Sequence, residues 1–135
     1  MRTIKFRGKS IYKDAWIYGY LHIIDNWYSL GEHKVIIKQE HHRNGNIPIY
    51  EDMQVIPETV GQFTGLKDKN GVEIYEGDIV IFEGSKHTII YCDYYAMFMA
   101  QMSEHYRISL FECEGSLIEV IGNIHEVAQT TEKGE

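Results

Sequence analysis

The stretch Thr59–Val80, TVGQFTGLKDKNGVEIYEGDIV, contains the strongest fold signals of this 135-residue chain. It encodes two chain reversals, at Lys69-Asn70-Gly71 and at Glu76-Gly77-Asp78, and apolar residues alternate around them. Asn-Gly supplies the positive φ angles that a tight hairpin needs. The stretch therefore predicts strand Thr59–Thr64, turn Asp68–Gly71, strand Val72–Tyr75 and strand Ile79–Phe82.

The composition of the whole chain favours β-structure. It contains 19 Ile, 7 Val and 10 Tyr against 5 Leu and 4 Ala. Residues that are β-branched or aromatic are enriched in strands, and good helix formers are scarce here. We predict an all-β fold with less than roughly a fifth of its residues helical, against a norm of about 30–35%. Within Tyr94–Tyr106 helix and strand periods compete, and both remain open.

The first part of the chain is predicted to form a sheet of short strands. Between Ala15 and His22 the residues divide cleanly between an aliphatic face and an aromatic face. Turns are expected at Gly8-Lys9-Ser10 and Asp25-Asn26, and the polar run Gln39–Asn46 predicts a loop. The predicted strands are Thr3–Arg7, Ala15–His22, Trp27–Leu30 and Lys34–Lys38.

Pro57 marks a joint in the chain near residue 55. We predict an N-terminal β region at residues 1–55, a second region at 56–127 and a flexible polar tail at 128–135. A Gly-Asp pair before an apolar strand, as at Gly77-Asp78, opens many SH3-like barrels, so the second region is predicted to be one. Its further strands are expected at Thr88–Cys92, Met97–Gln101, Arg107–Phe111 and Leu117–Ile124.

In four stretches the chain resembles the YopX family of small phage and prophage proteins. Its central block is similar to that family's TVGQYTGLKDKNGxEIYEGDIV, with Phe63 where Tyr is usual. Its start, MRTIKF, resembles MREIKFR, and the W-x-Y-G-Y pattern at Trp16–Tyr20 recurs there. Its stretch VIGNIHE, Val120–Glu126, resembles a VIGNIYE ending. The resemblance implies an all-β fold and a phage or prophage gene, and it transfers no catalytic residue.

The chain departs from the family pattern between Gln39 and Asp52 and between Glu83 and Gly115. A function specific to this member is expected in those two segments.

No motif predicts a catalytic, cofactor-binding or metal site, and no cofactor is expected. The adjacent residues Glu40, His41 and His42 are poorly placed to converge on one ion. The turn at Asp68–Gly71 lacks the D-x-[DN]-x-[DN]-G order of a calcium loop. Asp78 is predicted to accept backbone N–H groups at a strand start.

The two cysteines, Cys92 and Cys113, lack metal-site or redox spacing and are predicted to be free thiols of a cytosolic protein. Either could form a nucleophile pair with His87 or His105 only if the fold brought them together. The chain has no apolar signal region and no run near the ~20 apolar residues of a membrane span. We expect a location in the cytoplasm of a bacterial host and no membrane partner.

The strongest functional signal is aromatic. Trp16, Tyr18, Tyr20, Trp27 and Tyr28 form the predicted interface or ligand face. Such a face can stack nucleic-acid bases, or it can pack across strands or against a second subunit. We favour packing or an interface.

Charge is divided unevenly along the sequence. Residues 1–50 carry 8 basic and 4 acidic residues, a net of +4, whereas residues 51–135 carry 5 and 16, a net of −11. A chain of net charge −7 is a poor non-specific DNA binder, so only its N-terminal part could face phosphates. The acidic part could meet a basic partner.

Three functions follow, in order of preference. The first is a non-catalytic binding or regulatory module that forms a homo-oligomer and meets a host or phage protein. The second is a nucleic-acid accessory protein that uses the basic, aromatic N-terminal face. The third is an enzyme with a site assembled from scattered residues.

Overall fold

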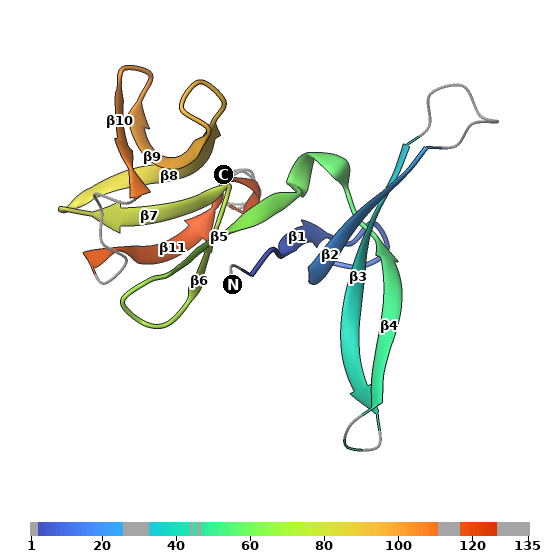
Figure 1. The fold of residues 1–135 in the computed structure, drawn as a ribbon. Coiled ribbons are helices and arrows are strands. Elements are labelled where there is room, and N and C mark those ends of the chain that lie inside the picture. The colour runs from blue at the N-terminus through green and yellow to red at the C-terminus, as the bar shows by residue number, and fades with distance from the viewer. Residues whose placement is uncertain (1–2, 26–32, 44, 46, 111–116, 127–135) are drawn as a thin grey trace, which may run out of the picture. The chain divides into compact units, whose positions relative to one another are not determined.

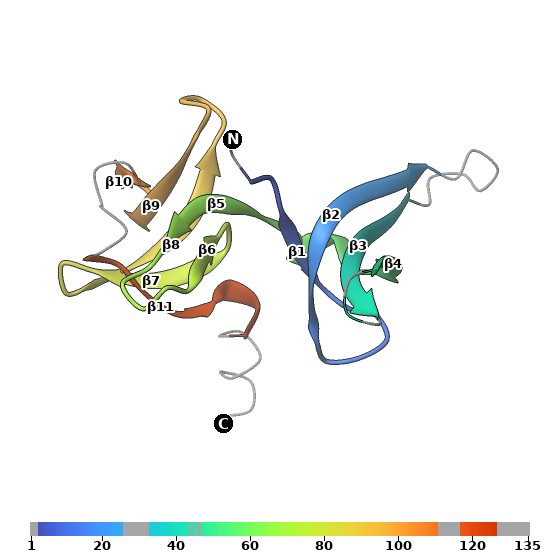
Figure 2. The same ribbon diagram turned by 60° about the horizontal axis from the view of Figure 1, so that its bottom comes forward.

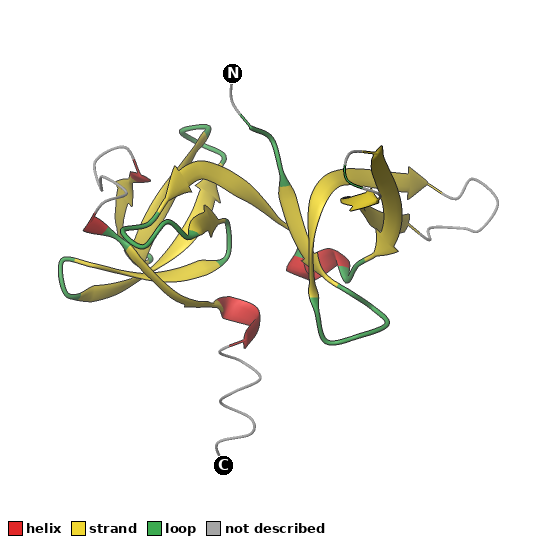
Figure 3. Cartoon of the chain, turned by 90° about the horizontal axis from the view of Figure 1, so that it is seen from below, coloured by secondary structure: helices red, strands yellow, loops and turns green. Residues whose placement is uncertain are grey.

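The computed structural model describes residues 3–25, 33–43, 45, 47–110 and 117–126. The predicted all-β fold is confirmed: strands dominate these residues, with only single helical turns such as η1 (Pro57–Thr59) between them (Figure 3). The chain divides into two compact units, Met1–Gln62 and Phe63–Glu135. The tail predicted at residues 128–135 lies outside the described residues.

The first unit is an antiparallel sheet in which β2 changes partner along its length. Strand order is β4-β3-β2-β1, and the start of β5 pairs with β1 (Figure 1). The first half of β2, Trp16–Gly19, pairs with β1, and Tyr20–Asp25 pair with β3 (Figure 2). The strands are β1 (Phe6–Lys9), β2 (Trp16–Asp25), β3 (His33–Arg43), β4 (Ile47–Gln54) and β5 (Gly61–Lys67).

The aliphatic face of β2 forms the core of this unit. Ile17 is buried with Val35, Ile37 and Val55, and Leu21 packs against them. On the opposite face Tyr18 and Tyr20 are exposed. The division of β2 into two faces is therefore confirmed.

The turn predicted at Gly8-Lys9-Ser10 is wrong. Strand β1 includes Gly8 and Lys9, and Ser10 forms a bridge with Val55. Two long-range hydrogen bonds hold this segment extended: the Lys9 N–H donates to Thr59 Oγ1 at 2.9 Å, and the Ile56 N–H donates to the Lys9 carbonyl at 2.8 Å.

The loop predicted at Gln39–Asn46 is also wrong as far as Arg43. Strand β3 continues through Gln39–Arg43 and pairs with Ile47–Glu51 of β4. Polarity misled the prediction because this part of the hairpin has no buried face and therefore needs no alternation. Its polar side chains interact with one another instead: His41 Nε2 pairs with Glu51 Oε2 across the strands at 3.0 Å, and His42 lies near Glu40 within β3.

The second unit contains a five-stranded antiparallel sheet of order β10-β9-β8-β7-β11 and a hairpin of β5 with β6. The paired strands among the described residues do not close into a barrel. Strand β9 resolves the ambiguity over Tyr94–Tyr106 in favour of a strand. The strands are β6 (Glu73–Tyr75), β7 (Asp78–Phe82), β8 (Ser85–Cys92), β9 (Met97–Ser103), β10 (Tyr106–Ser109) and β11 (Glu119–Asn123).

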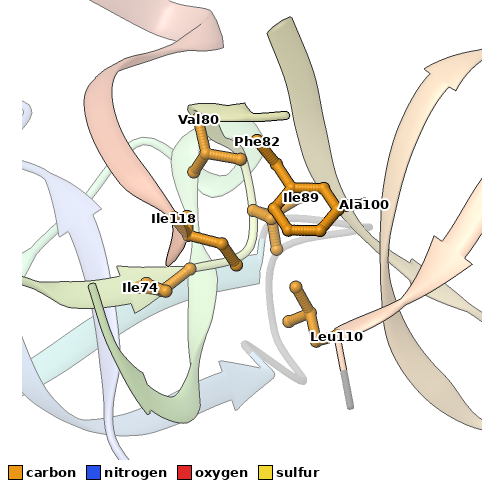
Figure 4. Packing of buried hydrophobic residues seen from close by; sticks show 7 residues of the cluster. All are labelled: Ile74, Val80, Phe82, Ile89, Ala100, Leu110 and Ile118. Carbon is orange, nitrogen blue, oxygen red and sulfur yellow. The ribbon is translucent and has the colours of Figure 1, made fainter. Parts of the chain in front are cut away.

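Seven buried side chains form the core of the second unit. Ile74, Val80, Ile89 and Ala100 are almost completely inaccessible, and Phe82 points toward Ile89 and Ala100 (Figure 4). Burial of each large aliphatic side chain contributes about 1.5–3 kcal/mol. The other two members of the cluster are Leu110 and Ile118.

A single carboxylate ties the hairpin turn to the last strand. Asp68 is buried; its Oδ1 accepts the N–H groups of Asn70 and Val72 at 2.8 and 2.9 Å, and its Oδ2 accepts that of Val120 at 3.0 Å. The predicted turn is confirmed, with Gly71 at φ 82°. Burial raises the pKa of Asp68, but the three N–H donors and Lys69 outweigh this and hold the pKa below its ordinary value.

Asp78 acts in the same way at the second reversal, as predicted. It is buried, and its Oδ2 accepts the Tyr75 N–H at 2.8 Å. Gly77 between them has φ 94°, donates its N–H to the Ile89 carbonyl and accepts the Ile124 N–H. The Tyr75–Asp78 reversal thus connects β6, β7, β8 and the end of β11.

Gly71→Val is expected to lower the free energy of unfolding by about 1 kcal/mol or more, because a β-branched residue is strained at positive φ. No atom lies within 4 Å of a Cβ at this position, so the loss reports backbone strain alone. Urea unfolding measures it. Gly71→Asn is the matched control and should lose less, since Asn tolerates this conformation. An unchanged midpoint and slope for Gly71→Val would contradict the assigned turn.

Asp68→Asn is expected to cost about 1–3 kcal/mol, because the amide group leaves a buried N–H donor without an acceptor. The folded-state pKa of Asp68 is lowered, so its contribution to stability is complete above about pH 4 and is lost as the pH falls through that pKa. Urea midpoints between pH 7 and pH 2 should therefore fall less steeply for Asp68→Asn than for the wild type. Asp93→Asn, at an exposed site, should follow the wild type.

Candidate binding surface

The predicted aromatic face exists over part of its length. Tyr18 and Tyr20 are 42% and 57% exposed on the face of β2 opposite the core. Trp16 is half-buried, with the Arg7 guanidinium 4.9 Å from the centre of its ring. This cation–π contact occupies the Trp16 ring. Trp27 and Tyr28 lie outside the described residues.

Sheet register places a third tyrosine on the same face. Tyr20 lies opposite Lys38, Lys38 opposite Asp52, and Glu40 opposite Tyr50. Directly opposed residues of antiparallel strands share a face. Tyr50 is 54% exposed. Sequence reasoning missed it because it stands in β4, beyond the segment taken for a loop.

A groove lies between the segment that leads into β1 and strands β2 and β3. Its volume is about 310 Å³. Tyr18 and Tyr20 line it from β2, and Lys5 and Lys38 bring positive charge to it. The other residues that line it are Thr3, Ile4, Gly19, Gln39 and Glu40.

Gly19 is what allows β3 to approach the tyrosines closely. A Cβ built on Gly19 would collide with the Lys38 carbonyl oxygen, which belongs to the backbone and cannot move aside as a side chain can. At this residue β2 exchanges β1 for β3 as its partner. The glycine of the W-x-Y-G-Y pattern is therefore required by packing, and it shapes the groove.

The distal part of the β3–β4 hairpin is a second exposed feature. Residues 39–43 and 47–51, here called the arm, lie beyond the last β2 pair, Tyr20 with Lys38, so two strands stand alone there. Three large apolar side chains are exposed on the arm: Ile47, Ile49 and Tyr50.

A hollow of about 630 Å³ lies along the β9–β10 hairpin of the second unit. Methionines 97 and 99 line it, with Arg107 and His105. The Arg107 guanidinium also lies 3.7 Å from the Sγ of Cys92, a free and buried thiol. This hollow and the arm both fall in the segments where the chain departs from the family pattern.

The structure gives the other predicted site residues structural roles or leaves them apart. His87 and Cys92 stand on opposite faces of β8, five residues and roughly 16 Å apart, so they form no nucleophile pair. Cys113 lies outside the described residues. Among the residues that the structure describes, no cluster of three potential metal ligands occurs. Within the same residues no helix is long and apolar enough to cross a membrane.

These features define a small all-β protein with exposed aromatic and aliphatic side chains on an antiparallel sheet. The chain belongs to the YopX family: the family model described as YopX protein matches residues 5–130. Among solved structures, the crystal structure of protein EF1440 from Enterococcus faecalis is similar, at 26% sequence identity and a TM-score of 0.58. The similarity covers 93% of this chain and 96% of that one. Comparison with curated proteins found no match.

Family membership confirms the resemblance, and the structure shows what its motifs do. Gly19, Asp68, Gly71 and Asp78 set backbone geometry. Asn123, in the VIGN piece, accepts the His125 and Glu126 N–H groups on its Oδ1. The motif residues named here therefore have roles in the fold.

Gly19→Ala is expected to destabilise the protein by about 1–3 kcal/mol, because β2 and β3 must separate to admit the methyl group. Urea unfolding measures the loss. Gly122→Ala is a control in a strand where no atom lies within 4 Å of the new Cβ, and it should change the midpoint much less. Equal midpoints for the two variants would contradict the close approach of β2 and β3.

Proposed function

We propose that this YopX protein is a non-catalytic binding module of phage or prophage origin, which acts as a homo-oligomer in the bacterial cytoplasm. The observation that carries the proposal is the arm. An isolated two-stranded hairpin is marginally stable at best in water. An arm of this kind with exposed Ile47, Ile49 and Tyr50 gains stability when another surface covers it.

A second copy of the chain is the partner that the charges favour. Counted by structural unit, residues 1–62 carry 8 basic and 7 acidic residues, a net of +1, and residues 63–135 carry 5 and 13, a net of −8. Copies that meet through their first units avoid the strong repulsion between their second units. The arm also presents hydrogen-bonding groups of complementary kind side by side, as in the His41–Glu51 pair, which suits a self-complementary two-fold interface.

Side chains rather than strand edges would make this contact. Pro48 stands in β4, which is an edge strand, and lacks the N–H that an added strand would bond. We therefore expect Ile47 and Ile49, which share one face of β4, at the centre of the interface, whereas Tyr50 stands on the opposite face of the strand.

The roles of the acidic residues support a non-catalytic function. Asp68 and Asp78, the two buried carboxylates of the central block, both accept backbone N–H groups. A carboxylate held in this way is a poor general base, because its lone pairs are engaged and protonation would break the turn.

We further propose that the second unit is a variant of the SH3-like barrel. Support comes from the β7-β8-β9-β10 meander, the return of β11 to β7, and the Val120–Asp68 hydrogen bond that links β11 to the β5–β6 turn.

A nucleic-acid accessory role is the second candidate function. One observation favours it: the exposed Tyr18 and Tyr20 stand beside Lys5 and Lys38 in one groove.

Light scattering coupled to size exclusion tests the main proposal at tens of micromolar protein, in low and moderate salt. The expected mass is a multiple of 15.8 kDa. Replacing both Ile47 and Ile49 with Ser should shift the protein toward the monomer, because the exposed apolar centre of the interface is lost.

Ile11→Ser is the matched control, since Ile11 is an exposed isoleucine of the same unit away from the arm, and it should leave the mass unchanged. A wild-type monomer at both salt concentrations would overturn the proposal. A stable oligomer that the double Ser variant leaves intact would overturn the arm as its interface.

A further inference from the structure

We propose that the groove of the first unit binds a nucleotide unit, with the base against Tyr18 and Tyr20 and the phosphate at Lys5 and Lys38. The inference deepens the nucleic-acid candidate and is tested separately from self-association, although the groove shares Gln39 and Glu40 with the arm. The groove volume of about 310 Å³ falls at the small end of ligand sites, which suits a single nucleotide.

The spacing of the two tyrosines suits a planar guest. Residues two apart on a strand stand on one face, roughly 6.4–6.8 Å from each other. A planar group in van der Waals contact with both rings needs them about 7–8 Å apart, so binding requires a slight outward tilt of the side chains. Gly19 between them brings the Lys38 backbone close, so β3 forms the adjacent wall.

Charge in the groove favours an anion. Lys5 and Lys38 oppose a single carboxylate there, that of Glu40. The Lys38 amine also lies 3.9 Å from Asp52, in a pair whose side chains are 45% and 58% exposed. An exposed pair of this kind contributes little, so a phosphate can replace Asp52 at small cost. Arg7, opposite Tyr18 on β1, adds positive charge beneath the same face.

Glu40 sets the orientation of the guest. A carboxylate repels phosphate but accepts the exocyclic amino group of cytosine. The base edge is therefore expected toward Glu40 and the phosphate toward the two lysines. Cytosine-containing probes are the ones to use first.

The test is fluorescence anisotropy of the full-length protein with a labelled ten-nucleotide oligodeoxycytidine. Unlabelled dCMP and a duplex of the same length serve as competitors. Two lysine–phosphate contacts to a single strand predict a slope of log K against log salt of about −1.4, and Lys38→Gln should reduce it to about −0.7. If dCMP competes with the labelled strand, a single nucleotide is sufficient for binding. If the strand binds and dCMP does not compete, the strand makes further contacts outside the groove; both outcomes support the site.

Three variants and one control variant test whether the groove is the site. Tyr20→Ala should weaken binding about tenfold, within the range for one lost base stack, whereas Tyr20→Phe should bind like the wild type. Asp52→Asn should bind at least as tightly as the wild type, because it releases Lys38. Tyr12→Ala, an exposed tyrosine of the same unit away from the groove, should have no effect.

Absence of binding to both dCMP and the single strand at millimolar ligand and low salt would overturn the inference. So would a preference for the duplex, or a Tyr20→Ala variant that binds like the wild type while Lys38→Gln leaves the salt slope unchanged. If the strand binds but the groove variants have no effect, the nucleic-acid role stands and the groove is excluded. The light-scattering result remains independent, since neither Ile47 nor Ile49 lines the groove.

Discussion

The second unit depends on one buried carboxylate. Asp68 closes the β5–β6 turn with one oxygen and holds the Val120 N–H of β11 with the other, 52 residues away in sequence. Beside it, the Lys69 N–H donates to the carbonyl of Ile118, whose side chain is part of the core. The residues next to Asp68 and Val120 therefore hydrogen-bond as well. Buried charges are tolerated only with such a set of donors. The central block and the VIGN piece of the YopX family are therefore the two sides of one hydrogen-bonded junction.

The sequence predicted this junction only in part. Asn70-Gly71 and Gly77-Asp78 predict the two chain reversals. A tight turn requires positive φ and short polar side chains, and both can be recognised from neighbouring residues in the sequence. The bond from Asp68 to Val120 is non-local, and no local pattern indicates it. The sequence predicts a strand only as far as Lys38, whereas β3 continues to Arg43. A hairpin without a buried face shows no alternation of apolar and polar residues, so Gln39–Arg43 has the pattern of a loop.

The sequence predicts some of the residues of the candidate surface, but not how the strands bring them together. Tyr18 and Tyr20 were expected on one face, and they are exposed there. Tyr50 joins them only through register with Glu40, and Lys38 only through register with Tyr20. The charge division at residue 50 also cut through β4, which pairs with β3. Once β3 and β4 are counted together, acidic Glu51 and Asp52 offset basic residues of β3, and the first unit is nearly neutral.

Each unit contains a hydrogen bond between residues far apart in the sequence, and these bonds affect the order in which the chain can fold during synthesis. The bond from Lys9 to Thr59 spans 50 residues within the first unit, and that from Val120 to Asp68 spans 52 within the second. Each unit is complete only when its distal partner has left the ribosome, and contacts of such separation form late. With N-terminal segments emerging first, the first unit can close while the second is still being translated. For a period, a nascent chain would display the arm and the groove ahead of the acidic unit, so a ligand or second nascent chain could meet them there first.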